Sequence, residues 1–448
     1  MHIQTDRALI PAATPSVRYL QILISAPSAP EPTEAPRPAA QVALVLDRSG
    51  SMDGSKIAMA RKAVTHAIRL LKPQDHMAVV CYDDQVDTLL ARTPASKEAK
   101  GLAFSRLANI DARGSTNLSG GWLAGAHELQ PEATDDVIAT AERGGGSGAA
   151  GVKRVLLLTD GLANAGEVDP QVLAATAVRL RREGITTSTF GIGADFDEEL
   201  LSQLATQGGG HFYYIEKAGQ IPDFFVSELG EALNVVARDA ALEIMCPPGV
   251  TAELLNDLPT EPVSLAAADP LAAGRAGLRV RLGDLVADQE LTLTIAVHMP
   301  EPPPLGTRIE VACCLTDKDA VLFPQPLTVD WTVVPAAEHD AQPVNHAVVR
   351  AVAAALAARA RAQALAKNRR GAYDEARQIL TDAARVLRVL GAGSVEVEAI
   401  IAKLQHDEQD FAAAMSPAML KQRHFVSYSI SASRDPEGKA RRKASTKA

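Results

Sequence analysis

The sequence lacks any apolar run that approaches the roughly 20 residues a helix needs to cross a bilayer. Its first residues also lack the basic stretch followed by an apolar stretch that is typical of a secretory signal. Cysteine is scarce, because the chain has only four and none of them has C-x-x-C spacing. These absences exclude a disulfide framework and a cysteine-rich metal site. We therefore expect a cytoplasmic protein with buried free thiols and no membrane partner.

Positive charge is in the minority. Lysine and arginine total 45 against 54 aspartate and glutamate residues, which gives a net charge of -9. This balance disfavours nucleic acid as a partner of the whole chain. Hydrophobic residues make up 47% of the sequence and charged residues 22%, as in ordinary folded proteins. At 448 residues, the chain is long enough for two or three domains.

Short apolar runs alternate with helical patterns between residues 40 and 235. The apolar runs are 42–46, 77–82, 155–158, 185–190 and 211–215, and the helical patterns are 56–71, 118–129, 172–182 and 198–207. Such alternation is typical of a parallel sheet that helices cover on both faces. We therefore predict an α/β domain over residues 40–235, with a doubly wound, mostly parallel sheet.

The rest of the chain has a different pattern of predicted strands and helices. Alternating strands without intervening helices predict an antiparallel, sandwich-like β domain over residues 236–335. Residues 1–39 contain one strand pattern, at 17–24, followed by a proline-rich linker. A lone strand is not stable, so we expect strand 17–24 to complete the later β domain. Strong helix formers predict a helical region over residues 344–415, and residues 431–448 have the composition of a basic disordered tail.

Oxygen-bearing side chains follow the strands of the α/β domain. Asp47, Ser49 and Ser51 come directly after the first buried strand, Thr116 precedes a helix, and Asp160 ends the third strand. Ligand sites in open α/β sheets lie beyond the carboxyl ends of the strands, where these loops would meet. Carboxylate and hydroxyl oxygens without histidine or cysteine favour Mg²⁺, with Mn²⁺ or Ca²⁺ as alternatives.

At these five residues the chain resembles the von Willebrand factor type A (VWA) family, whose metal-ion-dependent adhesion site is D-x-S-x-S followed by a distant threonine and a distant aspartate. Neighbouring segments 46–52, 114–121, 159–161 and 190–193 fit the family as well. With a strand before this domain and a β domain after it, the chain is also similar to bacterial cytoplasmic VWA proteins. It is more distantly similar to inter-alpha-trypsin inhibitor heavy chains.

The resemblance implies how the site works. Asp47, Ser49 and Ser51 would hold the ion directly or through water, Thr116 and Asp160 would complete the shell, and one position would stay open for an aspartate or glutamate of a protein partner. Two carboxylates only neutralise a divalent ion, so an incoming carboxylate is still attracted. Caps and turns would explain one of these residues but not the set of five.

Signals for catalysis are weaker. The first loop has Ser49 where a D-x-D phosphatase has its second carboxylate, and the chain has no G-x-S-x-G elbow and no P-loop. We therefore expect no catalytic residues, no bound organic cofactor and no enzymatic activity. A metal-dependent protein-interaction scaffold is our first interpretation. A non-catalytic subunit of an ATP-driven complex, as in chelatases and complexes with MoxR-type ATPases, is the alternative.

The helical region is basic. Residues 344–390 carry nine lysines and arginines and three acids, which leaves +6 in a chain of -9. A solvated face is the simpler interpretation, and an RNA-associated scaffold is a third hypothesis for the function. Residues 371–384 also resemble one tetratricopeptide-like helical hairpin, but a single unit cannot form a solenoid.

Overall fold

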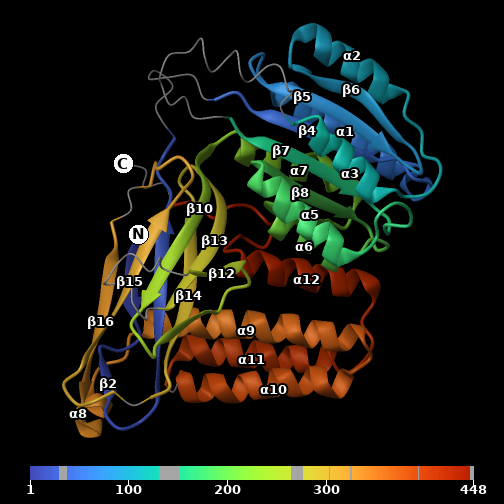
Figure 1. Cartoon of the computed structure of the whole chain (residues 1–448). Coiled ribbons are helices and arrows are strands. Elements are labelled where there is room, and N and C mark those ends of the chain that lie inside the picture. Colours follow the sequence, from blue (N-terminus) through green and yellow to red (C-terminus); the bar gives the residue numbers. More distant parts are fainter. Residues whose placement is uncertain are drawn as a thin grey trace, which may run out of the picture. The chain divides into compact units, whose positions relative to one another are not determined.

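The computed structural model describes residues 1–29, 38–130, 151–263, 276–301, 303–322, 325–391 and 393–443. The chain divides into two compact units (Figure 1). We call residues 29–235 the α/β unit, and residues 1–28 with 236–448 the β-helical unit. Part of the predicted proline-rich linker and the end of the predicted tail lie outside the described residues. None of the described helices combines the length and apolar character that crossing a bilayer requires.

The α/β unit is built on one six-stranded sheet with the order β6-β5-β4-β7-β8-β9. Its strands are β4 (Gln41–Asp47), β5 (His76–Tyr82), β6 (Val86–Pro94), β7 (Lys153–Thr159), β8 (Ile185–Ile192) and β9 (Gly209–Ile215). All neighbours pair in parallel except β6, which is an antiparallel edge strand. The predicted fold class is therefore confirmed. Strand β6 was not among the predicted elements.

Helices cover this sheet. They are α1 (Ser55–Leu70), α2 (Lys97–Ala108), α3 (Leu118–His127), α5 (Pro170–Arg182), α6 (Glu198–Gln207) and α7 (Ile221–Ala232). Helix α1 packs against α7, α5 packs against α6, and α3 lies on β4, β5 and β7. The apolar residues of α1 that recur at three- and four-residue spacing, among them Ile57, Val64 and Ile68, are buried.

Two glycines let α3 approach the sheet closely. A Cβ added at Gly121 would lie 2.3 Å from Tyr82 Cδ1, and one added at Gly125 would lie 2.3 Å from Val45 Cγ2. A side chain at either position would therefore push the helix outward. Because Thr116 lies just before the helix, this close packing also fixes how near Thr116 comes to the ends of the strands.

The β-helical unit contains a sandwich of two sheets. One sheet has the order β1-β3-β14-β11 and the other β12-β13-β10-β15-β16-β2. The strands are β1 (His2–Thr5), β2 (Leu9–Pro11), β3 (Ser16–Ser25), β10 (Val235–Cys246), β11 (Thr251–Leu254), β12 (Thr260–Val263), β13 (Ala276–Val286), β14 (Glu290–Met299), β15 (Arg308–Thr316) and β16 (Leu327–Val334). Strand β3 pairs with β14 along its whole length, from Ser16 opposite Met299 to Ser25 opposite Glu290. Its inward residues Leu20, Ile22 and Ile24 belong to the core between the sheets.

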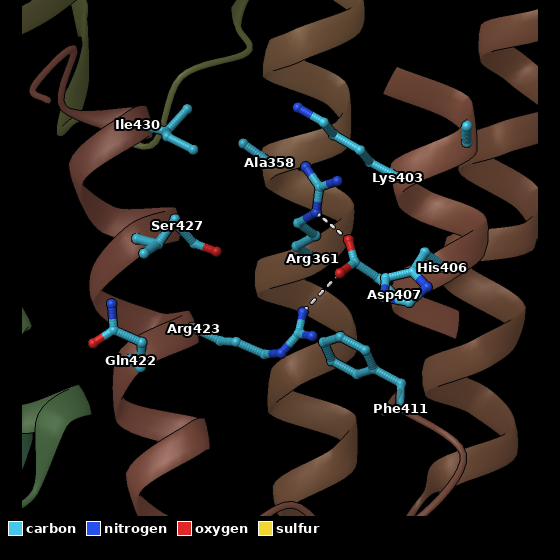
Figure 2. A pocket seen from close by; sticks show the side chains of 12 residues that line it. Ala358, Arg361, Lys403, His406, Asp407, Phe411, Gln422, Arg423, Ser427 and Ile430 are labelled. Carbon is cyan, nitrogen blue, oxygen red and sulfur yellow. Dashed lines mark hydrogen bonds and ion pairs between the residues drawn. The ribbon is translucent and has the colours of Figure 1, made fainter. Parts of the chain in front are cut away.

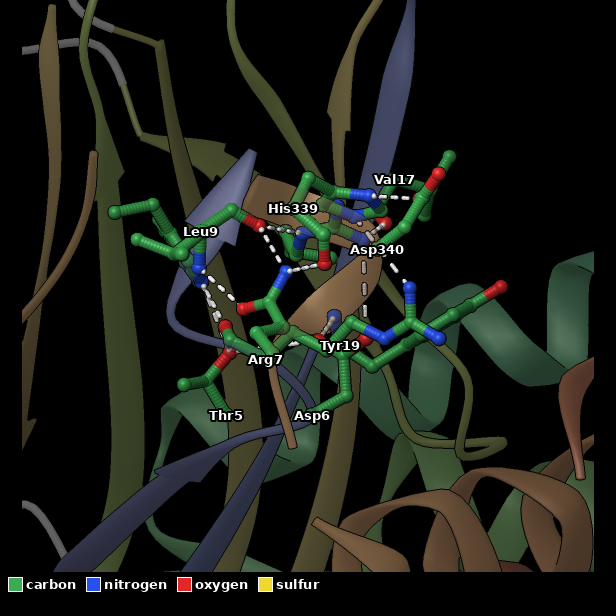
Figure 3. Close-up of polar contacts among 11 residues, drawn as sticks. Thr5, Asp6, Arg7, Leu9, Val17, Tyr19, His339 and Asp340 are labelled. Atoms are coloured by element: carbon green, nitrogen blue, oxygen red, sulfur yellow. Dashed lines mark hydrogen bonds and ion pairs between the residues drawn. The ribbon is translucent and has the colours of Figure 1, made fainter. Parts of the chain in front are cut away.

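A polar network fastens the N-terminal segment to the sandwich (Figure 3). Trp331 Nε1 donates to Thr5 Oγ1 at 2.9 Å, and Arg18 Nη2 donates to His339 Nε2 at 2.7 Å. Since arginine can only donate, His339 carries its proton on Nδ1, which faces the Asp340 carboxylate at 2.9 Å. Burial raises the pKa of Asp6, although Tyr19 N donates to its carboxylate and Arg18 lies nearby.

Helices follow the sandwich along the chain. They are α8 (Ala336–Ala341), α9 (His346–Arg369), α10 (Tyr373–Leu390), α11 (Val395–Asp410) and α12 (Pro417–Ser431). Helix α9 packs against α10, α11 and α12. On the sandwich side, α9 buries Val348 and Val352 against Leu255 and Ala296. The four-stranded sheet is thus covered on its outer face by α9.

The C-terminal segment differs from the predicted disordered tail. Helix α12 extends to Ser431, and the chain then returns to the sandwich, where Ser433 Oγ donates to Thr292 O at 2.8 Å. Arg442 forms a β-bridge with Gln289. Backbone and side-chain hydrogen bonds hold this segment in place, and its polar composition alone does not reveal them.

The pairing of β3 with β14 predicts a sharp difference between two adjacent residues. Ile22 is fully buried between the sheets, whereas Leu23 on the other face is 36% exposed. Ile22→Ala should lower the free energy of unfolding by about 2–5 kcal/mol because it leaves a cavity. Leu23→Ala should change it by less than about 1 kcal/mol.

Tryptophan fluorescence during urea unfolding can measure this difference. The chain has two tryptophans, Trp122 in the α/β unit and Trp331 in the β-helical unit. In a Trp122→Phe background, the signal of Trp331 reports the β-helical unit alone. Equal midpoints for Ile22→Ala and Leu23→Ala would contradict the register described here.

Candidate metal centre

The ends of two neighbouring strands bring the predicted carboxylates together. Strands β4 and β7 pair in parallel, with Leu46 opposite Leu158. Asp47 is the last residue of β4, and Asp160 directly follows β7, so both lie at the same edge of the sheet. Both residues are fully buried.

Asp47 is held by hydrogen bonds but not by a salt bridge among the described residues. Ser49 N donates to its Oδ1 at 2.7 Å, and Thr159 Oγ1 donates to its Oδ2 at 2.6 Å. Burial raises the pKa of Asp47 to about 6, although these hydrogen bonds act in the opposite direction, and the nearby Asp160 charge raises the pKa further. The site therefore holds a carboxylate that lacks a full counter-charge.

A chain of hydroxyl groups links the first loop to Asp160. Ser49 Oγ lies 3.2 Å from Ser51 Oγ, and Ser51 Oγ donates to Asp160 Oδ1 at 2.6 Å. Thr116 faces the same place, because a Cβ added at Gly161 would lie 3.1 Å from Thr116 Oγ1 and 3.6 Å from Ser51 Oγ. The structure thus gathers all five predicted residues, Asp47, Ser49, Ser51, Thr116 and Asp160, at one point.

Ion pairs around the buried Asp83 fix the loop that carries Thr116. Asp83 Oδ2 accepts from Arg48 Nε at 2.8 Å and from Arg113 Nε at 2.7 Å. Burial opposes ionisation of Asp83, but the hydrogen bonds from Arg113 and the backbone N of Gln85, together with Arg48, outweigh it and hold the pKa of Asp83 below its ordinary value. Backbone hydrogen bonds from Arg113 N to Arg48 O and from Gly50 N to Gly114 O join the same two loops.

Two contributors were not among the predicted site residues. Thr159 supplies the hydroxyl that donates to Asp47. Its position next to Asp160 at the end of a strand could have indicated this role from the sequence. Lys56, in the first turn of α1, places Nζ 2.5 Å from Asp160 Oδ2. A lysine in a helical pattern gives no sequence signal for such a contact. Its ammonium group compensates part of the negative charge of the cluster.

The donor set fits a hard divalent cation. Two buried carboxylates and three hydroxyls converge, and among these five residues there is no sulfur or nitrogen side chain. The Asp47 charge is the strongest indication, because burial of an unpaired carboxylate is unfavourable and a cation at this point would offset it.

Comparison with known proteins agrees with this geometry. A family model for the von Willebrand factor type A domain matches residues 41–226. The chain contains a VWA domain. The resemblance predicted from the five residues is confirmed. VWA domains often bind a divalent metal at a metal-ion-dependent adhesion site and mediate protein interactions.

The curated relatives match part of this chain. An uncharacterized protein of Escherichia coli, YfbK, is 30% identical over 209 residues, which are 46% of this chain and 34% of that protein. Mouse inter alpha-trypsin inhibitor heavy chain 4 is 25% identical over 46% of this chain and 21% of its own length. The chain therefore spans about a third of the first relative and a fifth of the second.

Two solved structures share the fold over nearly the whole chain. A von Willebrand factor type A protein from Catenulispora acidiphila superposes with a TM-score of 0.63 at 18% identity, over 95% of this chain and 89% of that one. The ArnB paralog VWA2 from Sulfolobus acidocaldarius gives a TM-score of 0.54 at 14% identity, over 94% and 97%. At these identities the likeness shows a common fold.

A second group of possible ligands lies elsewhere in the VWA domain. The side chains of His211, Glu228 and Glu231 come within 4.8 Å of one another. Glu228, however, already pairs with Arg154 at 2.6 Å and accepts hydrogen bonds from Ser188 and Tyr213. Because its charge is compensated, this cluster is a buried structural network that ties α7 to the sheet.

The raised pKa of Asp47 predicts a pH dependence of stability in metal-free protein. A carboxyl whose pKa is raised from 3.8 to about 6 on folding contributes stability below pH 4, and this contribution is lost as the pH rises through 6. In the presence of a chelator, Asp47→Asn should therefore become more stable than the wild type above pH 6, by about 2–3 kcal/mol.

Thermal unfolding of both proteins between pH 4 and pH 8 measures the effect. Other titrating groups cancel in the difference between the two curves, which should widen across this range and then level off. Parallel curves over the whole range would show that burial does not perturb Asp47.

Proposed function

We propose that this protein is a metal-dependent interaction protein whose VWA domain binds an acidic residue of a protein partner. The observation that carries the proposal is the meeting of Asp47 and Asp160, both buried, with the hydroxyls of Ser49, Ser51 and Thr116. Mg²⁺ is the ion that this all-oxygen set favours, with Mn²⁺ or Ca²⁺ as alternatives. When bound, the ion supplies a Lewis-acidic position for an oxygen ligand.

The residues around the ion would have different roles in binding it. Asp47 and Asp160 supply charge, and the three hydroxyls supply neutral oxygens that do not saturate it. Lys56 competes with the ion for Asp160, which limits affinity and makes ion binding reversible. With Lys56 beside Asp160, the ion, the two carboxylates and the ammonium group carry a net charge of about +1, which a carboxylate from a partner would balance.

The role we propose is non-catalytic. The described hydrogen bonds place Ser49 and Ser51 in a chain that ends on Asp160, and no histidine contacts either hydroxyl among the described residues. Neither serine is therefore activated as a nucleophile by a neighbouring imidazole. The set is suited to binding an oxygen ligand.

Metal binding can be tested with two aspartates of the same loop region. Asp47→Ala removes the central ligand and should abolish stabilisation by Mg²⁺, whereas Asp53→Ala, an exposed residue nearby, should leave it intact. Saturation at 100 times the dissociation constant stabilises by about 2.7 kcal/mol. For a unit of this size that raises the thermal midpoint by roughly 5–10 °C. Wild-type protein that does not respond to millimolar Mg²⁺, Mn²⁺ or Ca²⁺ would overturn the metal site.

Partner binding can be tested by affinity purification from native cells with the full chain as bait. A specific partner should be retained in Mg²⁺ by the wild type and by Asp53→Ala, and it should be lost with a chelator or with Asp47→Ala. Substitution of one acidic residue of the partner should have the same effect. An ATPase among the retained proteins would favour a role as a subunit of an ATP-driven complex, and RNA would favour the scaffold hypothesis. A partner that is still retained in the presence of a chelator and by the Asp47→Ala variant would contradict the proposal.

A further inference from the structure

A cavity of about 580 Å³ opens on the helices of the β-helical unit. It lies between α11 and α12 and is floored by α9 (Figure 2). Closely packed helices do not leave voids of this size, and small-molecule sites have volumes of about 300–1,000 Å³. The cavity is therefore large enough for a ligand, and it lies within one unit of the chain.

One wall of the cavity is cationic. Arg361 Nε donates to Asp407 Oδ2 at 2.6 Å, and Arg423 Nη1 donates to Asp407 Oδ1 at 2.8 Å. Arg423 also pairs with Asp410 and lies over the Phe411 ring, 5.3 Å from its centroid. The two aspartates thus hold the arginines in fixed positions. Fixed guanidinium groups lose little entropy when they bind an anion.

Part of this positive charge has no partner. Among the described residues, Lys403 forms no ion pair or hydrogen bond, and the terminal nitrogens of Arg361 form none either. Figure 2 shows that the Arg361 guanidinium and the Lys403 amino group reach into the same part of the cavity. The nearby Asp407 carboxylate already accepts from Arg361 Nε and Arg423 Nη1, so the Lys403 ammonium group and the terminal nitrogens of Arg361 are left to bind an anionic group.

The rest of the lining is largely apolar. Ala358 of α9, Ala402 of α11, and Val426 and Ile430 of α12 line the cavity beside the cationic groups. In Figure 2, Ile430 and Ala358 lie on the side of the cavity where Arg361 and Lys403 end. A fully hydrated inorganic ion would leave these surfaces unused, whereas an apolar body attached to the anionic group would cover them.

We propose that this cavity binds a small organic anion that joins a carboxylate or phosphate group to a short apolar body. Arg361 and Lys403 hold the anionic group, and the side chains of Val426 and Ile430 contact the apolar part. The site gives one cationic residue of the basic helical region, Arg361, a role in ligand binding. It does not depend on the proposed metal centre, which belongs to the other unit.

Isothermal titration calorimetry of the full chain tests this site with defined probes. Phenyl phosphate and 4-phenylbutyrate carry the two anionic groups, and 4-phenyl-1-butanol is the neutral control. The titrations use the Asp47→Ala background with a chelator, so that no metal-bound carboxylate contributes. We expect at least one anion to bind at micromolar to low millimolar concentration, at least tenfold more tightly than the alcohol, and more weakly at high salt.

Matched variants assign the binding to the cavity. Lys403→Glu should weaken the anion at least tenfold, and because Lys403 is exposed and unpaired, this variant should fold normally. Arg385→Glu on α10, which changes the charge equally but lies outside the cavity, should have no effect. Arg361→Gln should weaken binding as well. Because this variant also loses the contact with Asp407, its thermal midpoint is measured to show whether the fold is destabilised. The preferred probe identifies the anionic group.

Three outcomes would overturn the proposal. They are no binding of either anion up to 10 mM, equal affinity of the wild type and Lys403→Glu, and equal affinity for the anions and the neutral alcohol. Because every titration is done without metal, failure here leaves the proposed function untouched, and failure of the metal centre leaves this site untouched.

Discussion

Burial of two carboxylates at the ends of adjacent parallel strands is the constraint on which the VWA domain depends. Asp47 and Asp160 are both inaccessible, so their like charges repel in a medium that screens them poorly. Hydrogen bonds from Thr159, Ser49 and Ser51 spread the charge, and Lys56 compensates part of it. A proton or a cation would offset the charge that remains, and binding of a cation would then stabilise the fold.

Neighbouring residues fix the positions of the groups around Asp47 and Asp160. Glycines of α3 set the distance of that helix from the sheet, and the fully paired Asp83 fixes the loop that brings in Thr116. The contrast between Asp83 and Asp47 is informative, because both are buried aspartates in neighbouring loops. Two arginines satisfy Asp83, which makes it structural, whereas no arginine contacts Asp47 among the described residues, and its charge remains available for a ligand.

Features that short sequence motifs encode could be predicted, whereas features that depend on how distant elements pack could not. The five oxygen-bearing residues could be identified because the ends of strands in a parallel sheet meet, so short motifs in separate loops imply one site. The pattern of strand β3 was visible in its apolar composition. The contact of Lys56 with Asp160 was not visible, because it depends on the position of α1 relative to β7. The cavity beside Arg361 was equally hidden, since it arises from the spacing of α9, α11 and α12. The return of residues 432–443 to the sandwich rests on backbone hydrogen bonds and on the Ser433 hydroxyl, and a polar composition does not predict either.

The chain order of the sandwich has a consequence for biosynthesis. Strand β3 emerges early, but its partner β14 follows about 260 residues later, after the whole VWA domain. At 5–20 residues per second, the ribosome needs roughly 13–50 s to make that stretch. During this time Leu20, Ile22 and Ile24 have no native sheet to cover them, whereas the VWA domain can already fold. The nascent chain therefore exposes the apolar face of β3 through much of translation, and a chaperone that shields short apolar segments would bind there.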